Sequence, residues 1–223
     1  MDTAAQVPWP NVAAFVRQHT HDVRNHLNGI DLEAALLREL VTDPEALQGV
    51  ARLRQQVRDI AGELRSLSNR LADPMPRPTP IAAAELFEIW QEQVATIREP
   101  PCDVQWESKV NGEILEVDPN LVGGALLELV QNAFHFHEPP GTVKCAATNI
   151  GPHIEFRVYE TKAEPPGFAD WGKTPLQTTR RGALGLGLWN VQRVIAASRG
   201  EIERRYDPTE RRLVTVTRLP QRA

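Results

Sequence analysis

Three polar residues, His21, Asp22 and Asn25, form the group in this sequence that is best suited to chemistry. A neutral, accessible imidazole beside a carboxylate that can hold or take its proton meets the needs of a nucleophilic histidine. The alternative is an ordinary histidine on the polar face of a surface helix. The elements around His21 and the motifs further along the chain decide between the two.

The segment over 11–41 carries apolar or semi-polar residues at steps of three and four, which is typical of a long amphipathic helix. This stripe consists of Val16, His19, Val23, His26, Ile30, Ala34, Leu37 and Val41. We expect His19 and His26, which lie on the stripe, to be partly buried. His21 is about 200° around the helix from His19, so its side chain is expected to point away from the packed seam.

A second helix is predicted from Pro44 to about Leu71, with Asp43 as its N-cap. So short a turn between two long helices predicts an antiparallel hairpin. The apolar seam of the second helix consists of Leu47, Val50, Leu53, Val57, Ile60, Leu64, Leu67 and Leu71. Because one hairpin cannot cover both of its apolar faces, we expect a homodimer in which two hairpins form a four-helix bundle.

The proline-rich stretch 74–80 predicts a semi-rigid linker that separates residues 1–73 from residues 81–223. Beyond it the pattern becomes mixed α and β. Helices are expected near 81–97, 119–136 and 185–198. Strands are expected near 103–107, 113–117, 142–148, 153–159, 200–206 and 212–218. A loop over 161–181 is longer than a compact domain needs, and such loops are usually lids or disordered segments.

A second polar group, Glu128 and Asn132, lies on the helix predicted over 119–136. A spacing of four places both side chains on one face of that helix. A carboxylate oxygen and an amide oxygen one turn apart can hold a hydrated Mg²⁺, which keeps several waters and takes few protein ligands. Taken alone, this pair is a weak signal.

A third group is the glycine-rich turn with Gly182, Gly185 and Gly187, which opens through Leu188 into an apolar helix. Backbone N–H groups at such a turn, together with the helix dipole, form an anion site suited to phosphates. The alternative is a tight turn that serves only packing.

Together these groups resemble motifs of the two-component histidine kinases. The segment from His21 to Leu27 resembles their phospho-acceptor box, and the hairpin resembles their dimerisation and histidine-phosphotransfer domain. The segment 128–133 resembles the N box, 182–188 resembles the second glycine box, and 175–180 is similar to the lid segment. The resemblance implies an α+β protein, with a helical hairpin followed by an α/β sandwich of the Bergerat, or histidine kinase ATPase, type.

The resemblance also implies ATP and Mg²⁺ as ligands, with Glu128 and Asn132 at the metal and the second glycine box at the phosphates. His135 stands where the family usually has a phosphate-contacting lysine or arginine. Glu160 stands where the family has an aspartate that binds adenine. Lys162 and Glu164 replace two glycines that follow this aspartate, and side chains there can take the space of the base.

The function implied is that of a histidine kinase, which is phosphorylated by ATP on His21 and passes the phosphoryl group to a response-regulator receiver domain. Asp22 and Asn25 also resemble the family's phosphatase signature. Two other functions remain open. One is a histidine phosphotransferase that relays phosphate without binding ATP, and the other is an anti-sigma-type or scaffold protein that only binds a partner.

Composition restricts the partners and the cellular location that we expect. The net charge is −4 and no basic tract is present, which argues against nucleic acid as a partner. No apolar run reaches transmembrane length and no signal sequence begins the chain, so we expect no membrane contact and a cytoplasmic location. Cys102 and Cys145 follow no metal or redox spacing, in agreement with a reducing compartment.

Overall fold

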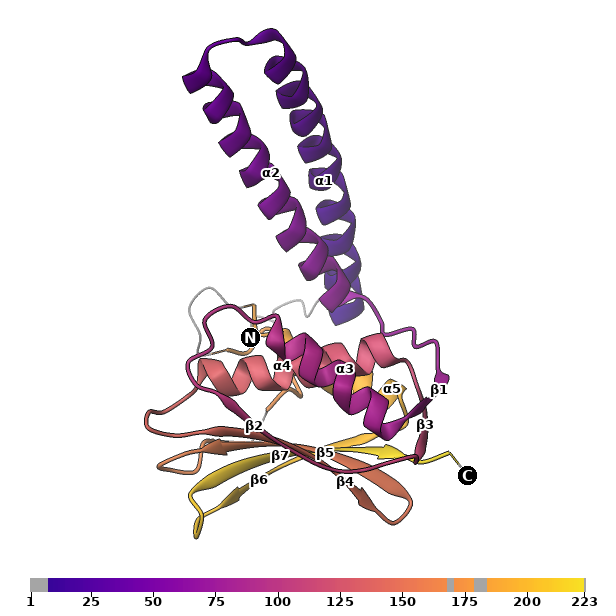
Figure 1. Ribbon diagram of the computed structural model, residues 1–223. Helices are drawn as coiled ribbons and strands as arrows, with labels where there is room; N and C mark the ends of the chain where they lie inside the picture. Colours follow the sequence, from indigo (N-terminus) through magenta and orange to yellow (C-terminus); the bar gives the residue numbers. More distant parts are fainter. Residues whose placement is uncertain (1–7, 168–170, 179–183, 223) are drawn as a thin grey trace, which may run out of the picture. The chain divides into compact units, whose positions relative to one another are not determined.

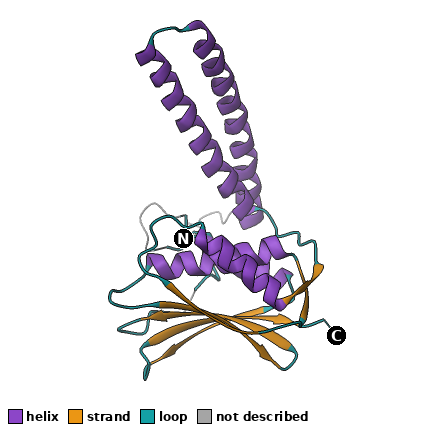
Figure 2. Cartoon of the chain, viewed as in Figure 1, coloured by secondary structure: helices purple, strands orange, loops and turns teal. Residues whose placement is uncertain are grey.

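The computed structural model describes residues 8–167, 171–178 and 184–222. The chain divides into two compact units that meet between Asp73 and Pro74. The first unit is a pair of long helices, and the second combines a sheet with a layer of helices (Figure 2). Each unit is described by itself.

The first unit is an antiparallel hairpin of α1 (Trp9–Leu40) and α2 (Pro44–Leu71), as the sequence predicted (Figure 1). The turn is fixed where α2 begins, because the Asp43 carboxylate accepts a hydrogen bond from the Ala46 N–H at 2.8 Å. The Arg54 guanidinium of α2 donates to both carboxylate oxygens of Asp31 in α1, at 2.8 and 3.1 Å. This bidentate pair fixes the register of the two helices.

The seam of α1 that packs against α2 differs from the predicted one. The buried residues of α1 are Ala13, Thr20, Leu27 and Ala34. His19 and His26 are exposed in the single hairpin, and their partial burial in a bundle of two hairpins stays a prediction. The Thr20 hydroxyl donates to the Val16 carbonyl at 2.6 Å, which satisfies its polar group and allows burial.

The second unit is built on a five-stranded mixed sheet in the order β2-β4-β5-β7-β6. The strands are β2 (Val104–Lys109), β4 (Val143–Ile150), β5 (His153–Thr161), β6 (Glu201–Asp207) and β7 (Arg212–Pro220). β2 and β4 are parallel, and the other neighbours are antiparallel. One face of the sheet is covered by a layer of three helices, α3 (Ala83–Ala95), α4 (Pro119–His135) and α5 (Gly187–Ala197) (Figure 1).

An aromatic cluster joins the helix layer to the sheet. The Trp90 side chain of α3 is fully buried and meets the rings of Phe87, Trp106 and Phe156 edge to face. The ring centroids are 5.2 to 6.1 Å apart, which is the favourable range for aromatic pairs. The α/β sandwich expected from the sequence is confirmed.

A short strand lies where part of the linker was predicted. β1 (Thr79–Ala82) pairs antiparallel with β3 (Ile114–Val117), and Pro80 stands opposite Glu116. Proline lacks an N–H and fits only an edge strand, and β1 has β3 as its neighbour in a two-stranded sheet. The predicted linker over 74–80 is therefore shorter than expected.

Candidate functional site

The His21 side chain lies on the surface of α1, with 64% of its area exposed. Its Nδ1 atom is 3.3 Å from Asp22 Oδ1 and 3.4 Å from Asn25 Nδ2. Gln18 donates to the same Asp22 oxygen at 3.1 Å, which helps to hold the carboxylate in place. An Nδ1–H that donates to Asp22 leaves the lone pair on Nε2, and a nitrogen with such a lone pair can act as a nucleophile.

Glu128, Asn132 and His135 lie along one face of α4, at spacings of four and three. Glu128 and Asn132 are half-buried and His135 is exposed. The His135 ring meets the Phe136 ring edge to face, with centroids 4.8 Å apart. Among residues 8–167, 171–178 and 184–222 no three His, Cys, Asp or Glu side chains form a metal cluster. A hydrated Mg²⁺ with few protein ligands fits such a face.

The second glycine box lies at the start of α5, which packs beside α4. Gly187 is the first residue of α5, Leu188 follows it, and Leu186 occupies the N-cap without a polar side chain. Gly182, and Arg180 of the predicted lid segment, lie outside the described residues. The glycine box and the Asn132 face therefore belong to neighbouring helices of one layer.

Gly185 has a φ of +63°, a conformation that favours glycine. The Leu176 N–H donates to the Gly185 carbonyl at 3.1 Å. A Cβ atom on Gly185 would lie 2.7 Å from the backbone N and O of Gln177. The close approach at Gly185 is thus made by the chain's own segment 171–178, an approach that the sequence did not indicate.

We expect Gly185→Val to destabilise the second unit by about 1–3 kcal/mol, because it adds backbone strain and a clash with Gln177. Urea denaturation followed by tryptophan fluorescence measures this loss. Gly112→Val is the matched control, since a Cβ there has nothing within 4 Å. Equal unfolding midpoints for the two variants would contradict the close contact of Gly185 with Gln177.

Glu160 lies near the end of β5 and is only 4% exposed. Lys162 Nζ is 3.8 Å from Glu160 Oε2, and Arg204 Nη2 is 3.7 Å from Glu160 Oε1. The Arg204 guanidinium stacks over the Trp171 ring, 4.7 Å from its centroid. Burial raises the pKa of the Glu160 carboxyl, and the charges of Arg204 and Lys162 oppose this rise.

Sequence reasoning missed Arg204 and Trp171 as neighbours of Glu160. Arg204 comes from β6, where it shares the half-buried face with Ile202 and Tyr206, and Ile202 packs against the core. An arginine at an inward position of a predicted strand is a signal that a buried carboxylate lies opposite. The sequence carries this signal, but the partner depends on the strand order.

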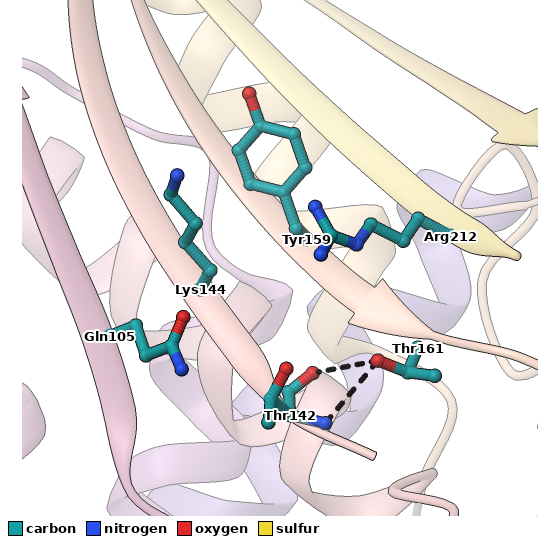
Figure 3. A pocket seen from close by; sticks show the side chains of 6 residues that line it. All are labelled: Gln105, Thr142, Lys144, Tyr159, Thr161 and Arg212. Atoms are coloured by element: carbon teal, nitrogen blue, oxygen red, sulfur yellow. Dashed lines mark hydrogen bonds between the residues drawn. The ribbon is translucent and has the colours of Figure 1, made fainter. Parts of the chain in front are cut away.

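A separate polar pocket lies on the opposite face of the sheet (Figure 3). Its lining residues are Gln105, Thr142, Lys144, Tyr159, Thr161 and Arg212. Lys144 is paired with Glu107 at 2.5 Å, and Arg212 is paired with Glu210 at 3.1 Å. Both cations that line this pocket therefore already have acidic partners.

The comparison with protein-family models finds no match. Two curated relatives are similar in sequence, each called sensory histidine kinase/phosphatase NtrB, from Escherichia coli O157:H7 and Shigella flexneri. Both are 27% identical over 205 residues, which cover 85% of this chain and 57% of the relative. The chain therefore spans little more than half the length of these relatives.

Solved structures share the fold. The catalytic domain of histidine kinase ThkA matches at 23% identity and a TM-score of 0.55, covering 65% of this chain and 96% of that chain. The mycobacterial sensor histidine kinase MprB matches at 24% identity and a TM-score of 0.54, covering 66% of this chain and 99% of that chain. Full-length ShkA, solved with AMPPNP, matches at 20% identity and a TM-score of 0.68, covering 93% of this chain and 46% of that chain. In sequence and in fold, the chain resembles the sensor histidine kinases, as its motifs predicted.

Proposed function

We propose that this chain is a cytoplasmic protein-histidine kinase of a two-component system. In this proposal ATP phosphorylates His21, and the phosphoryl group then passes to an aspartate of a response-regulator receiver domain. The observation that carries the proposal is the geometry at His21, whose exposed imidazole has Nδ1 beside both Asp22 and Asn25.

The step at His21 is a displacement at phosphorus. The Nε2 lone pair forms a bond to the γ-phosphorus of ATP while the bond to the bridging oxygen breaks, and ADP leaves with that electron pair. The imidazole becomes positively charged, with its remaining proton on Nδ1. Asp22 stabilises this cation and accepts the proton when the ring becomes neutral.

The second unit supplies the substrate site in this proposal. Asn132 and Glu128 offer the oxygens for Mg²⁺, and His135 lies one turn further along the same face of α4. The N-terminus of α5 at Gly187 and Leu188 offers backbone N–H groups to the phosphates, at an N-cap that has no side-chain acceptor of its own. Positioning and neutralisation of charge account for most of the catalysis in such a reaction.

The same residues support a phosphatase activity toward the receiver. Asn25 is one helical turn after His21, so its amide lies beside the imidazole. An amide and a carboxylate held in this way can orient a water toward an aspartyl phosphate. We therefore include hydrolysis of the phosphorylated receiver in the proposed function.

Phosphorus NMR of the phosphorylated chain tests which ring nitrogen of His21 carries the phosphoryl group. We expect one phosphoramidate signal with the shift of an Nε2-linked phosphohistidine, because Asp22 faces Nδ1. A signal from the Nδ1-linked form would contradict the assigned roles of the two ring nitrogens.

We further propose that the chain forms a homodimer through its hairpin. Ile30 and Leu37 on α1, and Leu53 and Ile60 on α2, are between 41% and 48% exposed. Each pair is seven residues apart, so each forms an apolar stripe along its helix. A second hairpin is a partner that would cover these stripes. Within residues 8–167, 171–178 and 184–222, no helix is long and apolar enough to span a membrane.

We expect Ile60→Glu to weaken the dimer at least about tenfold, because it buries an unpaired charge. Sedimentation across a concentration series measures the dissociation constant. Ser66→Glu adds the same charge at an exposed position about 120° around α2, and should leave the dimer intact. A dimer that is equally stable in both variants would place the contact elsewhere.

A relay without ATP is the second candidate, and a specific observation favours it. The carboxylate of Glu160, which the resemblance assigns to the base, already has Lys162 and Arg204 as charged neighbours. In this alternative His21 exchanges phosphate only between receiver domains. Loss of ATP labelling together with transfer from a phosphorylated receiver would select the relay.

A further inference from the structure

The Lys162 side chain is buried at the end of β5, with 7% of its area exposed. Its ammonium has three donors, and one carbonyl and two carboxylates lie around it. It donates to the backbone carbonyl of Phe136, at the C-terminus of α4. Glu138 Oε1 is 3.4 Å away and Glu160 Oε2 is 3.8 Å away. Lys162 thus connects α4, the segment that follows it, and β5.

The backbone around Lys162 is held as firmly as its side chain. The Lys162 N–H donates to the Arg211 carbonyl at 2.9 Å. The Tyr206 hydroxyl lies 3.2 Å from the Lys162 carbonyl and 3.3 Å from the Ala163 carbonyl. The Ala163 N–H donates to Glu138 at 3.0 Å. These contacts come from two sides, so the lysine side chain has a defined position.

The resemblance assigns Glu160 of this cluster to the base of the proposed nucleotide, which needs an open acceptor. A base with an amino group binds a carboxylate that can accept its N–H. Glu160 is buried between the cations of Lys162 and Arg204, and the Trp171 ring covers the guanidinium. Within the described part of the chain no group donates a hydrogen bond to Glu160 Oε2, so the lysine is held there by charge at 3.8 Å.

We propose that Lys162 closes the base end of the nucleotide site, so that this protein binds nucleotides through their triphosphate and Mg²⁺ without selecting the base. The inference rests on the proposed function, which places the phosphates at α4 and α5. Lys162 is then a residue that determines specificity: it removes a preference for adenine but leaves the phosphate end unchanged.

Calorimetry on the whole two-unit chain with ATP, GTP and inorganic tripolyphosphate, each with Mg²⁺, tests this inference. For the unmodified chain we expect three dissociation constants within about threefold of one another, since the base adds no contact. Lys162→Gly should improve ATP binding at least about tenfold and leave tripolyphosphate unchanged. Lys162→Met, which keeps the bulk but removes the charge, should remain unselective because the space stays filled.

Thermal unfolding of each variant shows that it is folded before it is titrated. ATP binding to the unmodified chain more than about tenfold tighter than tripolyphosphate would overturn the inference and leave the kinase intact. A Lys162→Gly variant that binds ATP no more tightly than tripolyphosphate would overturn the inference as well. If the unmodified chain binds none of the three, the kinase proposal fails. The inference fails with it, because it requires binding through the triphosphate.

Discussion

His21→Ala is expected to abolish phosphoryl transfer to this protein, both from ATP and from a phosphorylated receiver domain. The imidazole is the nucleophile in both reactions, and no other group lies beside both Asp22 and Asn25 among the contacts of α1 that the structure describes. Because His21 is exposed on the hairpin, its removal should leave the fold and the dimer unchanged. Gel-based labelling with a phosphorylated receiver measures the loss.

His19 and His26 provide the matched controls for this experiment. Both are exposed on α1 like His21, but within the described hairpin neither contacts a carboxylate. His19→Ala and His26→Ala should therefore be labelled at the rate of the unmodified chain. Label that survives in His21→Ala and disappears in His26→Ala would show that His26 is the phosphate acceptor.

Asn132→Ala is expected to remove Mg²⁺-dependent binding of ATP. The substitution takes away an oxygen that we assign to the metal, and alanine keeps the helix because it has the highest helix propensity. Calorimetry with and without Mg²⁺ measures the difference. The control is Gln131→Ala, which deletes an amide from a neighbouring, exposed position of α4.

Two outcomes separate this prediction from a general loss of structure. Asn132→Ala should unfold with the same midpoint as Gln131→Ala, because Asn132 is only half-buried. If Asn132→Ala retains the Mg²⁺ dependence of the unmodified chain, the metal is held by other groups and the assignment of the α4 face is wrong.

The hairpin and the order of elements were predictable because they depend on local patterns. Steps of three and four, and the Asp43 cap before Pro44, define α1 and α2 without any long-range information. The choice of packed face was less certain, since apolar residues cover more than one face of α1. The structure buries Thr20 and Leu27, and His19 and His26 lie one position away on the exposed side.

β1 was missed because its pairing is a long-range feature. Thr79–Ala82 contains a proline and follows a proline-rich stretch, which indicates a linker when only the local sequence is considered. The strand forms because β3 lies alongside it, from Ile114 to Val117. No periodicity within 74–82 could show that partner.

The same distinction between local and long-range features applies to the candidate site. The acceptor group, the α4 pair and the glycine turn are each contained in a few consecutive residues, and the sequence therefore shows them. The cluster around Glu160 draws Lys162 from the position just after β5, Arg204 from β6 and Trp171 from a loop. Only the strand order brings these side chains together, so the sequence predicted an obstruction at Lys162 but not its partners.

Incubation of the unmodified chain with γ-phosphate-labelled ATP and Mg²⁺ tests the central proposal most directly. A label that is stable in base, lost in acid, absent from His21→Ala and transferred to a receiver domain is the result that we predict. If the unmodified chain takes no label from ATP, yet accepts phosphate on His21 from a phosphorylated receiver, the kinase proposal is wrong and the protein is a relay.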